Sequence, residues 1–99
     1  MKEKEVEKYL VRRAEEKGGK AFKFLSPGCS GVPDRIVVLP GGRIGFLELK
    51  APGKNLRPEQ EYRIRQLEAL GCTAGAADSP EAAERFLCCL EAGYRREGI

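Results

Sequence analysis

The spacing of apolar residues changes several times along the chain and predicts alternating helices and strands. Near the start, Val6, Tyr9, Leu10 and Ala14 recur at intervals of three and four, the period of one helix face. Later apolar runs are short, alternating or β-branched, and Gly- and Pro-rich turns separate them. The pattern predicts a helix over 2–17, strands over 20–25, 35–39 and 44–50, a helix over 58–70, a strand over 72–77 and a final helix that opens at 79–81.

The two later helices are each expected to bury one apolar face. The inward residues predicted for them are Tyr62, Ile64, Leu67 and Leu70 in the first, and Phe86, Leu87 and Leu90 in the second. Gly71 provides a stop for the first of these helices. A polar tail follows at residues 94–97.

The order of elements predicts a single α/β domain over residues 1–99. Three successive strands are followed by a helical crossover to a fourth, which gives a mixed four-stranded sheet flanked by helices. A chain of 99 residues has room for one hydrophobic core.

Composition narrows the chemistry that the chain can perform. It has no histidine, and none of its four cysteines forms a C-x-x-C pair, which argues against a zinc site and against His-based catalysis. Cys72, Cys88 and Cys89 sit in apolar contexts and are expected to be buried, reduced thiols. If the chain is an enzyme, it therefore depends on Asp, Glu, Lys and a hard metal ion.

The net charge of the chain permits nucleic-acid binding, and its hydropathy argues against a membrane protein. The net charge is +3, from 18 basic and 15 acidic residues. The longest uncharged apolar run, Ile36–Leu39, falls far short of the ~20 residues that span a bilayer. The charged first ten residues do not resemble a secretory signal. A cytoplasmic protein is the expectation.

The hairpin formed by the second and third strands holds the unusual residues. Alternation places Leu47 and Leu49 on one face of its returning strand and Glu48 and Lys50 on the other. Asp34 directly precedes the partner strand, so the hairpin brings it beside Glu48. Buried charges are costly unless they are paired or bind a metal. These residues form either a structural ion pair at a strand end or a site for metal-assisted phosphodiester hydrolysis, with carboxylate ligands for Mg²⁺.

The same residues resemble a known family. Gly31-Val-Pro-Asp34, thirteen residues, then Glu48-Leu-Lys50 is similar to the P-D…E-x-K signature of the PD-(D/E)XK nuclease superfamily. The longer text SPGCSGVPDRIVVLPGGRIGFLELKAPG, followed by RPEQEYRIRQLEALG, resembles a VRR-NUC domain of the small stand-alone type found in phages and prophages. The resemblance covers about residues 3–90.

The resemblance implies a fold, an activity and roles for individual residues. The fold is the restriction-endonuclease-like αβββαβ core, and the activity is Mg²⁺- or Mn²⁺-dependent cleavage of DNA by a homodimer acting on branched substrates such as four-way junctions. Asp34 and Glu48 match the metal-binding acids, the Leu49 carbonyl a further ligand, Lys50 the catalytic lysine and Gln60 the glutamine after the E-x-K motif. The first helix is implied to supply another acid, Glu7, with Glu3 one turn earlier as the alternative.

Several basic residues could contact DNA phosphates. The main candidates are Lys23, Arg35, Lys54 and Arg57, and Lys20, Arg63 and Arg65 are further ones. Lys54 and Arg57 lie in the loop just after Glu48-Leu-Lys50 and are expected near the site. No sequence-reading element is apparent, so recognition of DNA shape is expected.

Two other functions stay open at this point. A non-catalytic DNA-binding or dimerisation module could use the same fold, and would show salt-dependent DNA affinity without metal-dependent products. A nuclease for RNA or single strands is disfavoured because the chain lacks an aromatic stacking platform. If a phage or prophage encodes the chain, the expected location is the cytoplasm of a bacterial host.

Overall fold

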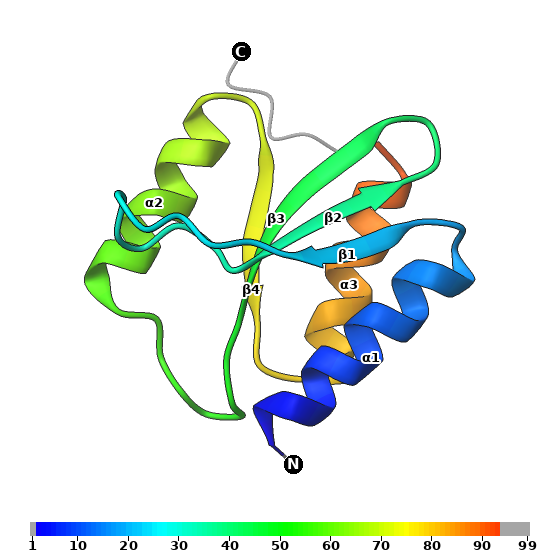
Figure 1. Cartoon of the computed structure of the whole chain (residues 1–99), viewed down its shortest axis with the longest axis horizontal. Coiled ribbons are helices and arrows are strands. Elements are labelled where there is room, and N and C mark those ends of the chain that lie inside the picture. The colour runs from blue at the N-terminus through cyan, green and yellow to red at the C-terminus, as the bar shows by residue number, and fades with distance from the viewer. Residues whose placement is uncertain (1, 94–99) are drawn as a thin grey trace.

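The computed structural model describes residues 2–93 and shows one α/β domain built on a four-stranded sheet (Figure 1). The predicted fold class is confirmed, and the predicted tail at residues 94–97 lies outside the described residues. The elements, in chain order, are α1 (Glu3–Glu16), β1 (Lys20–Lys23), β2 (Arg35–Leu39), β3 (Arg43–Leu49), α2 (Pro58–Ala69), β4 (Thr73–Ala77) and α3 (Pro80–Glu91).

The strands lie in the order β1-β2-β3-β4, and the sheet is mixed. The first two pairings are antiparallel, whereas β3 and β4 are parallel and are joined by the α2 crossover. In the register between β2 and β3, Arg35 lies opposite Leu47 and Leu39 opposite Arg43. A parallel strand placed next to β3 makes β3 an interior strand, which limits access of water to its middle.

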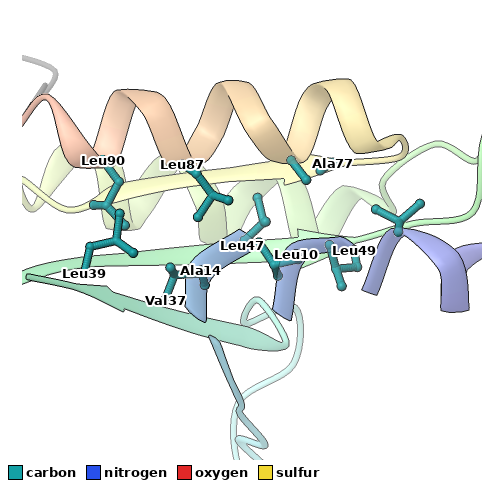
Figure 2. Close-up of a cluster of buried hydrophobic side chains, with 11 residues drawn as sticks. Leu10, Ala14, Val37, Leu39, Leu47, Leu49, Ala77, Leu87 and Leu90 are labelled. Atoms are coloured by element: carbon teal, nitrogen blue, oxygen red, sulfur yellow. The ribbon is translucent and has the colours of Figure 1, made fainter. Parts of the chain in front are cut away.

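The core lies between the sheet and the layer formed by α1 and α3, which pack side by side (Figure 1). Alternate residues of β2 and β3 point into it, as Val37, Leu39, Leu47 and Leu49 show in Figure 2. Leu10 of α1 joins them, and the remaining members from the helices and β4 are Val6, Ala14, Ala77, Ala83, Leu87 and Leu90. The expected inward side of α1 is thereby confirmed.

The other face of the sheet is covered unevenly. α2 lies on this side and packs chiefly against β4, so within residues 2–93 no helix layer covers the faces of β1 and β2 and the first half of β3 (Figure 1). Gln60 and Ile64 are the buried residues of α2. A helix that covers only one strand can bury only a narrow stripe of its own surface.

This uneven cover accounts for two wrong predictions in α2. Tyr62 and Leu70, expected to face inward, are 62% and 75% exposed. Their periodicity fits a wider apolar face than the one that α2 actually buries. In α3, Leu87 and Leu90 are buried as predicted, and Phe86 is partly buried.

The cysteine prediction was also partly wrong. Cys88 and Cys89 are exposed on the outer side of α3, and Cys72 is partly buried; all of them are free thiols. The apolar neighbours of Cys88 and Cys89 in the sequence, Leu87 and Leu90, occupy the buried side of the helix, which turns the cysteines outward.

A polar cluster joins α1 to α3 at the surface. The Glu84 carboxylate accepts hydrogen bonds from Tyr9 Oη at 2.9 Å and from Arg13 Nε at 2.9 Å, and lies 3.5 Å from Lys17 Nζ. Hydrogen bonds from Arg13 are the main reason that the pKa of Glu84 falls to about 2. No helix in residues 2–93 has the length and apolar content needed to cross a bilayer.

The loop between β1 and β2 docks on the first turns of α2. Arg63 Nη2 donates to the Ser30 carbonyl at 3.2 Å. Gly31 has a φ of +83°, and a Cβ there would collide with the Glu59 carbonyl. The loop therefore approaches the helix backbone closely, in a conformation that favours glycine, just before the chain enters Pro33 and Asp34.

We expect Gly31→Ala to lower the free energy of unfolding by about 1–3 kcal/mol, because the substitution combines left-handed backbone strain with a backbone collision. Gly28→Ala in the same loop is the matched control, since a Cβ there meets nothing within 4 Å. Urea unfolding followed by circular dichroism measures both variants. Equal stability of the two would show that the loop does not hold this close approach.

Candidate active site

The register of β2 and β3 places two carboxylates at one end of the sheet. Because Arg35 lies opposite Leu47, the next position outward sets Asp34 opposite Glu48, on the face away from the core. The Asp34 carboxylate is fixed by the returning strand: its Oδ1 accepts a hydrogen bond from the Leu49 N–H at 3.2 Å. The Asp34 carbonyl accepts from the Phe24 N–H at 2.8 Å, which ties β1 to the same point.

Gln60 links α2 to Glu48 through both ends of its amide. Its Nε2 donates to Glu48 Oε2 at 3.1 Å, and its Oε1 accepts from the Arg57 N–H at 2.9 Å at the start of the helix. Both side chains are buried, with Glu48 7% and Gln60 5% exposed. The helix terminus therefore holds Gln60, and Gln60 holds one oxygen of Glu48, leaving the carboxylate little freedom to rotate.

The two carboxylates are held in an environment that opposes their negative charge. Burial raises the pKa of Glu48, and the nearby charge of Asp34 raises it further, to about 7. Burial likewise raises the pKa of Asp34, against the lowering effect of the Leu49 N–H and of Lys23 and Lys50. Folding thus assembles an anionic pair that its surroundings do not neutralise.

Lys50 directly follows β3, and the alternation of the strand sets it on the same side of the sheet as Glu48. Its backbone N–H donates to the Ala77 carbonyl at 2.9 Å, which fixes its place at the end of β4. The positive charge of Lys50 lowers the pKa of both Asp34 and Glu48. The side chain also lines a polar hollow with Lys54, Asn55 and Asp78.

Glu7 and Arg35, predicted as a metal ligand and a DNA contact, form an ion pair with each other. The Arg35 guanidinium makes an ion pair with the Glu7 carboxylate and is only 6% exposed. The prediction that Arg35 contacts DNA is wrong, because its side chain lies on the core face, where burial lowers its pKa. The alternation of residues along β2 could have predicted this core-facing position, since Arg35 shares a face with Val37 and Leu39.

The structure does not bring Glu7 to the carboxylate pair. Among residues 2–93, no group of three His, Cys, Asp or Glu side chains comes close enough together to hold a metal ion by side chains alone. Glu3, the alternative acid of the first helix, contributes a small part of the raised pKa of Glu48, but within residues 2–93 it does not complete such a group either.

The remaining basic candidates are solvent-facing. Lys23, Lys54 and Arg57 are exposed near this end of the sheet, as a contact with phosphate requires. Arg65 is exposed on α2, Arg63 is engaged with the Ser30 carbonyl, and Lys20 pairs with Glu15 at 3.2 Å. Lys23 differs from these residues in that its positive charge lowers the pKa of Asp34.

The donor set of this site fits a hard divalent cation. Asp34 and Glu48 supply carboxylate oxygens, the backbone carbonyl of Leu49 adjoins them in the chain, and Mg²⁺ prefers oxygen ligands. A cation bound between buried Glu48 and partly buried Asp34 would lower the free energy of their charged forms, whose pKa values are raised. The structure thus brings together Asp34, Glu48, Leu49, Lys50 and Gln60, as the sequence suggested.

Comparison with known proteins gives an independent view of the chain. No protein-family model matches it. It is 46% identical over 81 residues to a protein called "Putative nuclease p44" from Acyrthosiphon pisum secondary endosymbiont phage 1, a match that covers 82% of this chain and 87% of that protein. The fold also matches a solved structure called "VRR_NUC domain" with a TM-score of 0.79 and 30% identity, covering 95% of this chain and 99% of that one.

The two matches cover 82% and 95% of this chain. The solved structure shares the fold in which Asp34 and Glu48 meet, and the phage relative bears a nuclease name. On the combined grounds of motif, fold and sequence identity, the chain belongs to the VRR-NUC domain family of nucleases.

Proposed function

We propose that the chain is a Mg²⁺- or Mn²⁺-dependent endonuclease that hydrolyses DNA phosphodiester bonds in branched structures such as four-way junctions. The observation that carries this proposal is the pair of buried Glu48 and partly buried Asp34, with Lys50 on the same side of the sheet and a hydrogen bond from Gln60 to Glu48. A purely structural ion pair would neutralise its charges. Here burial raises the pKa of both carboxyl groups, and the charge of Asp34 raises that of Glu48 further, which favours a bound cation.

Asp34, Glu48 and the Leu49 carbonyl are the groups that would hold the metal. When bound, the ion supplies charge neutralisation at the phosphate and lowers the pKa of water. The residues that hold it are fixed in advance: the Leu49 N–H positions Asp34, and Gln60 positions Glu48. Such preorganisation lowers the reorganisation needed during the reaction.

Lys50 is proposed to orient the attacking water and to stabilise negative charge that develops on the phosphate oxygens. Its positive charge lowers the pKa of both carboxyl groups, and its stem leaves a strand that is fixed between β2 and β4. A cation in a partly desolvated site interacts more strongly with developing charge than one in water. Gln60 keeps the remaining Glu48 oxygen directed toward the site.

The DNA backbone is proposed to lie across the end of the sheet that carries this site. Lys23, Lys54 and Arg57 are exposed there and would contact phosphates, which position DNA without reading its sequence. Recognition would then follow DNA shape. Paired cuts in a four-way junction require two active sites, so the proposal includes a homodimer, acting in the cytoplasm of a bacterial cell.

We expect Lys50→Met to reduce the rate of metal-dependent cleavage by at least about a thousandfold while leaving the fold intact, because it removes a charge that acts on the reacting phosphate. The assay uses a labelled four-way junction and its matching linear duplex, with Mg²⁺, Mn²⁺ or EDTA. Lys8→Met, on the exposed side of α1, is the matched control and should cleave as the unmodified chain does.

Cleavage that survives EDTA, or that Lys50→Met retains, would contradict the proposed site. Junction binding without cleavage in either metal would favour a non-catalytic binding module. Equal cleavage of junction and duplex would keep the nuclease and remove the preference for branched DNA.

Glu48→Gln is expected to stabilise the metal-free protein at pH 8. The folded-state pKa of Glu48 is about 7 against a usual value of 4.5, so the folded state binds the proton more tightly. The corresponding stability is fully present below pH 4.5 and is lost as the pH rises through 7, a loss of about 2–3 kcal/mol. Thermal melts at pH 5 and pH 8 in EDTA should show a gain for Glu48→Gln only at pH 8.

The same variant also tests metal binding without an activity assay. Added Mg²⁺ should raise the melting temperature of the unmodified protein and leave that of Glu48→Gln almost unchanged. Glu61→Gln, an exposed position on α2, controls for the loss of one negative charge. An equal Mg²⁺ response in all three proteins would mean that the ion binds elsewhere.

Lys23→Ala and Lys54→Ala should each weaken junction binding and lower the salt slope of the affinity by about 1, since each removes one phosphate contact. Binding is measured by fluorescence anisotropy with Ca²⁺ in place of Mg²⁺, over a range of NaCl concentrations. Lys4→Ala, exposed on α1, should leave the slope unchanged. An unchanged slope in both test variants would place the DNA elsewhere.

A further inference from the structure

A hollow of about 500 Å³ lies next to the proposed active site and shares Lys50 with it. Its walls come from the end of β4, the first turn of α2 and the loop that joins β3 to α2 (Figure 1). Pockets that hold small organic ligands have volumes of about 300–1,000 Å³. The hollow therefore has room for a ligand the size of one nucleotide.

The loop beside the hollow is held by its own turn and by β4. The Lys54 N–H donates to the Ala51 carbonyl at 3.0 Å, and Gly53 has a φ of +79°. With Pro52 at its second position, this segment is a type II turn, which requires a positive φ at the third position. The Gly53 N–H also donates to Asp78 Oδ2 at 3.3 Å, just beyond the end of β4. The turn and this bond together fix the wall that the loop provides.

The hollow adjoins the carboxylate pair through two residues. The side chain of Lys50 lines it, and the charge of Lys50 lowers the pKa of both Asp34 and Glu48. Ala76, a second lining residue, lies beside Glu48 in the register of β3 and β4, and neighbouring strands are about 5 Å apart. A DNA strand with one phosphate at the carboxylates would therefore carry an adjacent nucleotide to the hollow.

The charged residues of the hollow fit a ligand with two unlike ends. Lys50 and Lys54 contribute ammonium groups, whereas Glu61 and Asp78 contribute carboxylates. The carboxylates oppose a ligand that is anionic throughout, and the ammonium groups oppose a cation. A nucleotide meets both requirements, because its phosphate is anionic while its base carries N–H donors and neutral acceptors.

The uncharged lining residues suit a base. The side-chain amide of Asn55 both donates and accepts hydrogen bonds, as the polar edge of a base does. Leu56 and Ala76 add apolar surface against which the face of a base can pack. Proteins that hold a base outside the stack combine these two kinds of contact. Within residues 2–93 no aromatic side chain lines the hollow, so the base would not stack there on a second ring.

We propose that the hollow receives one nucleotide, turned out of the base stack, next to the phosphodiester bond that is cut. The inference rests on the proposed function, because it takes the carboxylate pair as the place of the phosphate that reacts. Turning out a nucleotide costs least where bases are unpaired or already unstacked. The hollow would thus give the site its preference for branch points over intact duplex.

The first experiment uses the unmodified chain and 2-aminopurine, a base analogue whose fluorescence rises when it leaves the stack. The analogue replaces single bases, one at a time, around the branch point of a four-way junction. Ca²⁺ takes the place of Mg²⁺, so that binding is read without cleavage. Fluorescence should rise at least about threefold at one position near the branch on binding, because that base becomes unstacked. No rise at any position would overturn the inference.

The second experiment fills the hollow. Ala76 is exposed on β4, and Ala76→Phe would occupy the space that the base needs. It should abolish the fluorescence rise and lower the ratio of junction affinity to duplex affinity by about 10-fold. Ala69→Phe, at an exposed position of α2 outside the hollow, is the matched control and should keep both. A rise that persists in Ala76→Phe would contradict the proposed occupant.

A smaller change guards against a variant that fails to fold. Asn55→Ala removes one amide from an exposed loop position and adds no bulk. It should weaken junction binding by about 3- to 10-fold, because the edge of the base loses a hydrogen-bond partner. Circular dichroism and thermal melts report whether each variant is folded. Junction binding by folded Asn55→Ala and folded Ala76→Phe that equals binding by the unmodified chain would overturn the inference.

The outcome for the hollow is separable from the outcome for the nuclease, since fluorescence is measured without cleavage. A rise that Ala76→Phe removes, in a protein that cuts nothing in Mg²⁺ or Mn²⁺, supports the nucleotide site and overturns the nuclease activity. Metal-dependent cleavage with no rise at any position does the reverse. Neither a rise nor cleavage overturns both proposals.

Discussion

Two carboxylates that share one buried end of a sheet are the constraint on which the rest of this molecule depends. Asp34 and Glu48 meet because β2 and β3 pair in a single register, in which Arg35 lies opposite Leu47. A slip of one residue would send Glu48 to the core face and Leu47 to the other. The hydrophobic core therefore enforces the geometry of the carboxylate pair: in this register, burial of Val37 and Leu47 also brings Asp34 and Glu48 together.

Neighbouring elements hold this unfavourable pair in place. The Leu49 N–H fixes Asp34, and Gln60 fixes Glu48 from the first turn of α2. The raised pKa of Glu48 reflects the free-energy cost of keeping its carboxylate charged while it is buried beside Asp34. A cation bound between the two carboxylates, as proposed, would offset this cost and so stabilise the folded chain. On the other side of β2, the ion pair between buried Arg35 and partly exposed Glu7 links α1 to the same strand.

The sheet is covered unevenly on the side that carries the site. α2 packs chiefly against β4 and supplies Gln60 to Glu48. Within residues 2–93, no other helix lies on that side of the sheet.

The amino-acid sequence by itself determined the order of elements, the fold class and the central hairpin. These follow from local spacing: the period of α1, the β-branched run at 35–39 and the turn at 40–43 are each visible in a few residues. Asp34, Glu48 and Lys50 were likewise found from alternation within one hairpin, and Gln60 from its place in a family pattern.

Only the tertiary structure decided which faces of the helices are buried. It turned Tyr62, Leu70, Cys88 and Cys89 outward, because a helix buries no more than its neighbours cover, and that width is not encoded in its own periodicity. It also paired Arg35 with Glu7. Such contacts join residues far apart in the chain, and their free energies depend on burial and distance, which arise only when the chain has folded.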